Sequence, residues 1–136
     1  MFFKEKNNQN EDFIDICALL IHAAKIDEDY SDEEKQIIRK TLLLIGVNKE
    51  DVENILLKGE AIEKDSNQIL NFTKKVKNMS EEDKIKIIEA LWQIIYSNNE
   101  ADIYETNLMR RLSGLLYIDN KIMGDIKEKI KKEYLK

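Results

Sequence analysis

The residues best suited to chemistry lie in an acidic stretch, residues 26–34. Six of the eight positions from Asp27 to Glu34 carry a carboxylate. Carboxylates crowded into one turn repel each other unless a positive charge offsets them. Calcium and magnesium ions bind carboxylate, amide and carbonyl oxygens, so Asp27 and Glu34 are candidate ligands of a divalent cation. Helix capping is the alternative, because acidic side chains stabilise a helix N-terminus without any bound ion.

A second stretch, residues 97–105, repeats the spacing of the first. Asn98 follows Asp27, and Glu105 follows Glu34, by the same offset in residue number (98 − 27 = 71 and 105 − 34 = 71). That offset also pairs residues of the flanking segments: Leu20 with Leu91, Ile37 with Leu108, Ile38 with Met109 and Arg39 with Arg110. A constant offset across helix, loop and helix indicates an internal duplication whose two copies share one core. Asn98 carries no charge, which lowers cation affinity in the second copy.

Capping is supported by the local pattern as well. Ser31-x-x-Glu34 has the form of a capping box, in which the hydroxyl accepts the Glu34 N–H and the carboxylate accepts the Ser31 N–H. Asp102-x-x-Glu105 repeats this arrangement. The two interpretations, capping alone and a cation site, both remain open at this point.

The single histidine and single cysteine exclude most other site chemistry. They supply neither a zinc-finger ligand set nor the paired Glu-x-x-His motifs of a di-iron bundle. His22 lies one position from an apolar stripe, which favours a boundary residue, and Cys17 lies within the stripe, which favours a core residue. The acidic stretch is no EF-hand, because Asp32 and Ile38 stand where that motif needs glycine and glutamate.

The elements that must position these residues are helices. The 136 residues are 36% charged and 43% apolar, with four glycines and no proline, a balance typical of amphipathic helices in one domain. Apolar spacing predicts an all-α bundle of about seven helices, beginning near residues 11, 31, 48, 66, 80, 102 and 120. The third should end near Gly59, and the fifth should be central. We expect residues 1–10 to be a flexible segment and residues 11–136 to form the helical domain.

Charge and segment composition limit the partners. The net charge of −5 opposes binding to nucleic acid. No apolar run is long enough for a signal peptide or an integral membrane segment. Phe2 and Phe3 could contact a membrane surface peripherally, a partner or a groove of the domain itself. One cysteine without a disulfide partner favours a cytoplasmic location.

Over about residues 11–130 the sequence resembles the TerB-like (tellurite-resistance) superfamily. The motifs that carry the resemblance are residues 24–34, Ala-Lys-Ile-Asp-Glu-Asp-Tyr-Ser-Asp-Glu-Glu, and their counterpart in residues 96–118. The resemblance implies a pseudo-twofold helical domain whose two acidic loops lie close together and bind a metal ion. Matched residue by residue, the metal ligands would be Asp27, Glu34, Asn98 and Glu105. Glu28 and Asn99 replace the glycine that usually follows the aspartate.

These observations predict a non-enzymatic cytoplasmic module that binds a divalent cation, Ca²⁺ or Mg²⁺, or an unidentified partner protein through its acidic surface. The family name suggests a role in tellurite or stress response. A ligand-free interaction domain, with a groove between the repeats for a peptide, is the alternative. A metal-assisted hydrolase, with Asp27 and Glu34 holding the cation, is the third interpretation.

Overall fold

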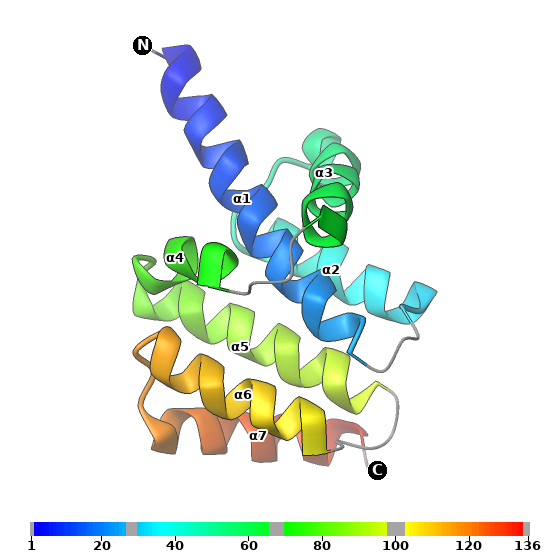
Figure 1. Cartoon of the computed structure of the whole chain (residues 1–136), viewed down its shortest axis with the longest axis vertical. Coiled ribbons are helices and arrows are strands. Elements are labelled where there is room, and N and C mark those ends of the chain that lie inside the picture. Colours follow the sequence, from blue (N-terminus) through cyan, green and yellow to red (C-terminus); the bar gives the residue numbers. More distant parts are fainter. Residues whose placement is uncertain (1, 27–29, 66–69, 98–102, 135–136) are drawn as a thin grey trace.

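The computed structural model is all-α, as the sequence predicts (Figure 1). It describes residues 2–26, 30–65, 70–97 and 103–134, with side chains from residue 11 onward except at residues 70, 71 and 103–106. Within these ranges there is no strand. The elements in chain order are α1 (Phe2–Ala24), α2 (Asp32–Leu44), the 3-10 helix η1 (Lys49–Asp51), α3 (Val52–Asp65), α4 (Leu70–Lys77), α5 (Glu81–Tyr96), α6 (Ile103–Leu115) and α7 (Asn120–Tyr134).

Helices α1 and α5 form the centre of the bundle. α1 packs against α2, α3, α4 and α5, whereas α5 also contacts α2 and α7. Figure 1 shows α5 lying between α1–α4 on one side and α6 and α7 on the other. The predicted central position of α5 is therefore confirmed. In α1, residues 16–21 are all 0–1% exposed, so this part of the helix is buried on every side rather than along one stripe.

Helix α1 begins earlier than the sequence predicts. It starts at Phe2 instead of Glu11, and its first turns extend beyond the other helices (Figure 1). Residues 2–10 contain no proline or glycine, and Lys4, Glu5 and Lys6 favour helical backbone, so nothing in this segment stops the helix. The predicted flexibility of residues 1–10 concerns motion and stays a prediction.

The predicted end of the third helix near Gly59 is wrong. α3 continues to Asp65, with Gly59 in its interior. A Cβ atom at this position would lie 2.9 Å from Cys17 Sγ and 3.1 Å from Cys17 Cβ. Gly59 is therefore the point at which α3 approaches α1 closely, instead of a helix stop.

Helices α2 and α6 end in the same hydrogen-bonded cap. The Val47 N–H donates to the Leu42 carbonyl (2.9 Å), and at the corresponding positions of the second half the Ile118 N–H donates to the Ser113 carbonyl (3.1 Å). Each cap contains one residue with positive φ, 112° at Gly46 and 56° at Tyr117, which are related by the same offset. This is the Schellman geometry. Gly46 is thus a left-handed helix stop, and the matching caps agree with the predicted duplication, which stays a prediction.

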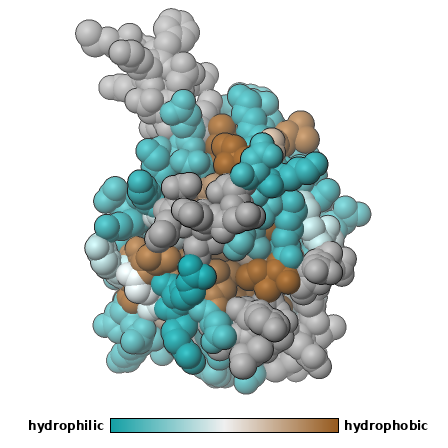
Figure 2. Space-filling model, viewed as in Figure 1, coloured by the Kyte–Doolittle hydropathy of each residue, from teal (hydrophilic) through white to brown (hydrophobic). Residues whose placement is uncertain are grey.

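The described surface is mainly polar. On the face in Figure 2 hydrophilic residues predominate, and the apolar areas are separated from one another. Five large apolar side chains are exposed among the described residues: Leu43, Leu44, Leu57, Ile62 and Tyr117. No helix in the described ranges has both the length and the apolar composition that a membrane crossing requires.

Candidate functional site

The four predicted metal ligands are described to different extents. Asp27 and Asn98 lie outside the described residues. The backbone of Glu105 lies in the first turn of α6, but its side chain is also outside the described set. Glu34 alone has a described side chain.

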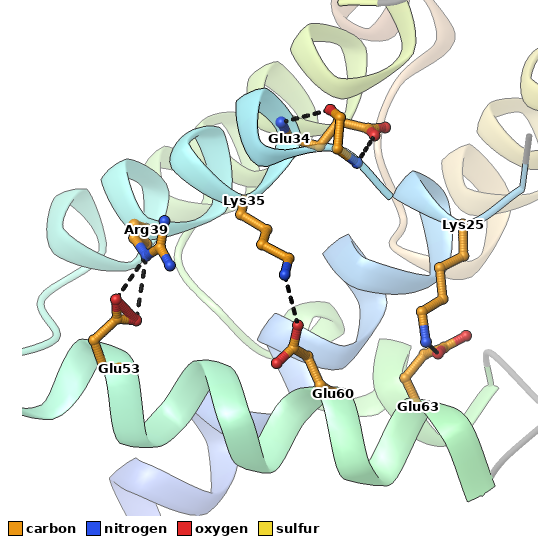
Figure 3. A network of polar contacts seen from close by, with 8 residues as sticks. Lys25, Glu34, Lys35, Arg39, Glu53, Glu60 and Glu63 are labelled. Atoms are coloured by element: carbon orange, nitrogen blue, oxygen red, sulfur yellow. Dashed lines mark hydrogen bonds and ion pairs between the residues drawn. The ribbon is translucent and has the colours of Figure 1, made fainter. Parts of the chain in front are cut away.

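Glu34 forms the predicted capping box at the start of α2. Its N–H donates to Ser31 Oγ (3.1 Å), and its Oε1 accepts the Ser31 N–H (2.8 Å; Figure 3). The Glu34 side chain is 0% exposed. Glutamate is almost never fully buried in proteins unless it is paired, because desolvation of the carboxylate costs free energy. The capping prediction is confirmed, and the complete burial is an additional finding.

The cap of α5 is simpler than the capping box of α2. Ser80 caps α5, and its Oγ accepts the Asp83 N–H at 3.2 Å. Asp83 holds the same third position in its helix as Glu34 does in α2, but its side chain is about one third exposed. Of these two described helix starts, that of α2 is the one in which the third residue completes a capping box, and there its carboxylate is buried.

Three ion pairs join α3 to α2 and to Lys25, just after α1, a set we call the α3 clamp (Figure 3). Its acidic members on α3 have spacings of seven and three residues, which place them on one helical face. The pairs are Lys25–Glu63 at 2.9 Å, Lys35–Glu60 at 3.9 Å and Arg39–Glu53 at 2.9 Å. His22 Nδ1 also lies 3.5 Å from Glu63. The clamp fixes the end of α1 and the first turns of α2 against α3, on both sides of the first acidic loop.

Tyr30 fills the space beside this clamp. Its ring centre lies 4.9 Å from Lys35 Nζ and 5.9 Å from Lys25 Nζ, distances at which the ring faces attract cations. Burial raises the pKa of the Tyr30 hydroxyl, and the neighbouring Glu60 carboxylate raises it further. Both effects keep the hydroxyl neutral, so Tyr30 acts as a structural residue at physiological pH.

The two acidic loops belong to neighbouring ends of helices. Figure 1 shows the ends of α1 and α5 and the start of α2 on the same side of the bundle. A pocket of about 420 Å³ lies between the last turns of α1 and the first half of α6, lined by His22, Ile26, Asn107, Leu108 and Arg111. The structure thus brings the segment before Asp27 close to the segment after Glu105. His22 is partly exposed here, as expected for a boundary residue.

Of the four predicted cation ligands, only Glu34 has a described side chain, so the structure tests the proposed ligand set at this residue alone. Within the described residues, no group of three or more His, Cys, Asp or Glu side chains could hold a metal ion. Oε1 of Glu34 already accepts the capping bond, so a cation would share this carboxylate with the cap. The four-residue metal site therefore stays a prediction.

The α3 clamp was not predicted from the sequence. Glu53, Glu60 and Glu63 form a charged stripe on α3, but Glu60 and Glu63 lie beyond the predicted end of the third helix near Gly59. Their partners lie on α2 and just after the end of α1, and no local pattern links the two sets of residues. The stripe alone is typical of any solvated helix face.

Comparison with known proteins gives one match. The sequence profile of a family described as Tellurite resistance protein TerB matches residues 13–128, which include both acidic stretches. No curated protein matches the chain significantly. No solved structure does so either.

Proposed function

The chain belongs to the TerB family, and from this premise we propose that it is a non-enzymatic cytoplasmic module that binds a divalent cation between its two acidic loops. Asp27 and Glu34 supply ligands from the first loop, and Asn98 and Glu105 from the second. This set of three carboxylates and one amide suits Ca²⁺ or Mg²⁺, which prefer oxygen ligands. The cytoplasmic location is proposed from Cys17, the single cysteine, which is buried as a free thiol.

The observation that carries the proposal is the buried carboxylate of Glu34. Glu34 is fully enclosed at the edge of the first acidic loop, whereas Asp83, at the same position of α5, is about one third exposed. A cation lowers the free-energy cost of a buried carboxylate by offsetting its charge. The pocket between α1 and α6 adds support, because it brings the flanks of the two loops together.

Titration with CaCl₂ or MgCl₂, followed by NMR of the backbone amides, tests the proposal. We expect saturable shifts at Ser31 and Glu34 with a dissociation constant of about 10⁻⁴–10⁻³ M, the range of weak calcium sites. Glu34→Gln should abolish these shifts, because it removes a charged ligand. The same change should lower the free energy of unfolding by less than about 1 kcal/mol, since glutamine also serves in a capping box.

Glu33→Gln is the matched control. Glu33 is the exposed neighbour of Glu34, so the substitution removes the same charge from the same turn. It should leave most of the cation affinity in place. The cation site is wrong if neither ion shifts the amides at millimolar concentration, or if both substitutions weaken binding equally.

A peptide-binding module is the second candidate, and the α1–α6 pocket favours it. This pocket has an apolar part, Ile26 and Leu108, and a polar part that includes Arg111, the usual mixture in sites that bind a ligand. Arg111→Glu should then abolish capture of a partner protein. If the pocket does not serve the cation site, the same variant should leave the cation titration unchanged.

The family name is the basis for proposing a role in tellurite or another stress response. Loss of growth on tellurite in a deletion strain, rescued by the wild-type gene but not by Glu34→Gln, would link the cation site to that role. The hydrolase interpretation requires a measurable reaction. Cation-dependent hydrolysis of a phosphate ester by the wild type, and its absence in Glu34→Gln, would favour this interpretation.

A further inference from the structure

A second site lies in the other part of the bundle, between α5, α6 and α7. It is a pocket of about 170 Å³ that involves the second half of α6 and the first half of α7, the parts nearest to the connection between these helices. Two of its lining residues are cationic, and one is the single tryptophan of the chain. The lining residues are Trp92, Met109, Arg110, Ser113, Asn120, Met123, Gly124 and Lys127.

The first half of the chain contains the counterpart of this pocket. A groove between α2, η1 and α3 has four lining residues that correspond to residues of the second pocket at the offset of 71. The corresponding pairs are Arg39 and Arg110, Lys49 and Asn120, Val52 and Met123, and Glu53 and Gly124. The two sites can therefore be compared position by position.

The comparison shows that the second pocket lacks the carboxylate that the first groove contains. In the first half, Arg39 Nε lies 2.9 Å from Glu53 Oε1 and 3.2 Å from Oε2 (Figure 3). In the second half, Gly124 stands at the position of Glu53, and a Cβ atom there would meet nothing within 4 Å. Among the described residues, no carboxylate forms an ion pair with Arg110.

Two further groups in the second pocket favour an anion. Lys127 takes the place of Leu56 at the same offset, and its Nζ lies 5.4 Å from the centre of the Trp92 ring. Trp92 is 3% exposed, and its indole N–H has no hydrogen-bond acceptor in the described part of the chain. A buried N–H without an acceptor is rare in native proteins. The pocket lining thus combines two cationic residues, a tryptophan whose buried N–H has no acceptor among the described residues, and open space beside Gly124.

We propose that this pocket binds a carboxylate, which takes the place that Glu53 holds in the first half. Arg110 supplies the guanidinium, as Arg39 does for Glu53, and Lys127 supplies a second positive charge. The volume is well below the ~300–1,000 Å³ of pockets that hold drug-sized ligands. The ligand is therefore a single acidic side chain of a partner protein or a small carboxylic acid. This site is independent of the cation site.

The single tryptophan makes the pocket directly observable, because the indole N–H gives one resonance in an ¹H–¹⁵N NMR spectrum. The probes are sodium acetate, a hexapeptide with one central glutamate, and the same peptide with glutamine. We expect saturable shifts of the Trp92 indole with the glutamate peptide or acetate, at dissociation constants on the order of 1–10 mM. The glutamine peptide should cause no such shift.

Three variants locate the binding. Gly124→Glu restores the carboxylate of the first half and should abolish the titration, while circular dichroism shows an unchanged helical content. Arg110→Gln should weaken binding by roughly tenfold or more. Arg39→Gln, the matched control in the first half, should leave the titration unchanged.

The outcomes distinguish a partner protein from a small carboxylic acid as the source of the carboxylate, and they define the results that would overturn the proposal. Binding of the glutamate peptide that is at least roughly tenfold tighter than that of acetate assigns the pocket to a protein partner. Similar affinities assign it to a small carboxylic acid. The proposal is overturned if neither probe shifts the indole up to about 50 mM, if the glutamine peptide acts like the glutamate peptide, or if Gly124→Glu binds as tightly as the wild type.

Discussion

At the scale of single residues, Gly59 sets the distance between the two most closely packed helices. A Cβ atom on Gly59 would lie 2.9 Å from Cys17 Sγ and 3.4 Å from the backbone nitrogen of Ala18. Gly59→Ala should therefore push α3 away from α1, at a cost of about 1–3 kcal/mol for overpacking. The higher helix propensity of alanine offsets this cost by up to about 1 kcal/mol. We expect a net loss of about 1–2 kcal/mol in the free energy of unfolding, measured with urea.

Gly124→Ala is the control for this prediction. Gly124 also lies inside a helix, but its Cβ would meet nothing within 4 Å. Only the higher helix propensity of alanine then affects stability, so this variant should be more stable than the wild type by about 0.5–1 kcal/mol. Equal effects of the two substitutions would mean that α1 and α3 are not as close at Gly59 as the structure shows.

Single residues also show what local sequence could predict. The capping box of Ser31 and Glu34 was predictable because both of its hydrogen bonds lie within one turn. Gly46 and Gly59 look alike in the sequence, since each stands within two positions of the end of a run of apolar residues. Gly46 ends a helix with a φ of 112°, whereas Gly59 accommodates Cys17. Only the position of α1, far away in the sequence, distinguishes the two roles.

At the scale of elements, the α3 clamp should stabilise the fold through Glu63. This carboxylate is only 10% exposed and lies between Lys25 and His22. A double-mutant cycle with Lys25→Met and Glu63→Gln should give a coupling energy of about 0.5–1 kcal/mol, because the pair is partly shielded from water. Urea unfolding of the four proteins measures it.

The pair Lys75–Asp12, between α4 and α1, is the control for the clamp. Its distance of 3.1 Å is similar, but both side chains are nearly half exposed. Solvent screening should reduce its coupling energy to near zero. A clamp coupling that is no larger than this surface coupling would show that the clamp does not hold α3 in place.

The helices themselves were largely predictable, because hydrophobic spacing reports which face of a helix is buried. Phe72, Thr73 and Val76 of α4, whose spacing places them on one helical face, are buried at 1%, 4% and 0% exposure. The all-round burial of α1 was not predictable in this way. It depends on how many other helices surround α1, which spacing within one helix does not encode.

At the scale of the whole molecule, the constant offset between the two halves links features that no single element explains. It was visible in the sequence because it joins the acidic stretches and the apolar residues around them. The structure adds the two matching caps and the two matching grooves. The residues that differ at corresponding positions, Glu53 and Gly124 above all, then become the natural places to look for function.

Alkaline pH should destabilise the whole molecule through groups that are buried in their neutral form. Burial, and then the negative charge of Glu60, raises the pKa of Cys17 to about 12, against about 8.5 for an ordinary cysteine. Burial likewise raises the pKa of Tyr30, Tyr96 and Tyr134. Between the two pKa values of Cys17 the unfolded chain has lost the proton that the folded chain keeps. The free energy of unfolding should therefore fall as pH rises, by up to about 1.4 kcal/mol per pH unit for this group alone.

Urea unfolding at pH 8, 9, 10 and 11 measures this slope, and Cys17→Ala isolates the contribution of the thiol. The variant should be less stable at every pH, since it leaves a cavity beside Gly59, but its free energy of unfolding should fall less steeply between pH 9 and pH 11. The slope is compared instead of the absolute stability because the cavity affects all pH values equally. Parallel curves for the two proteins would mean that the Cys17 thiol ionises as easily in the folded chain as in the unfolded one, which is incompatible with its burial between α1 and α3.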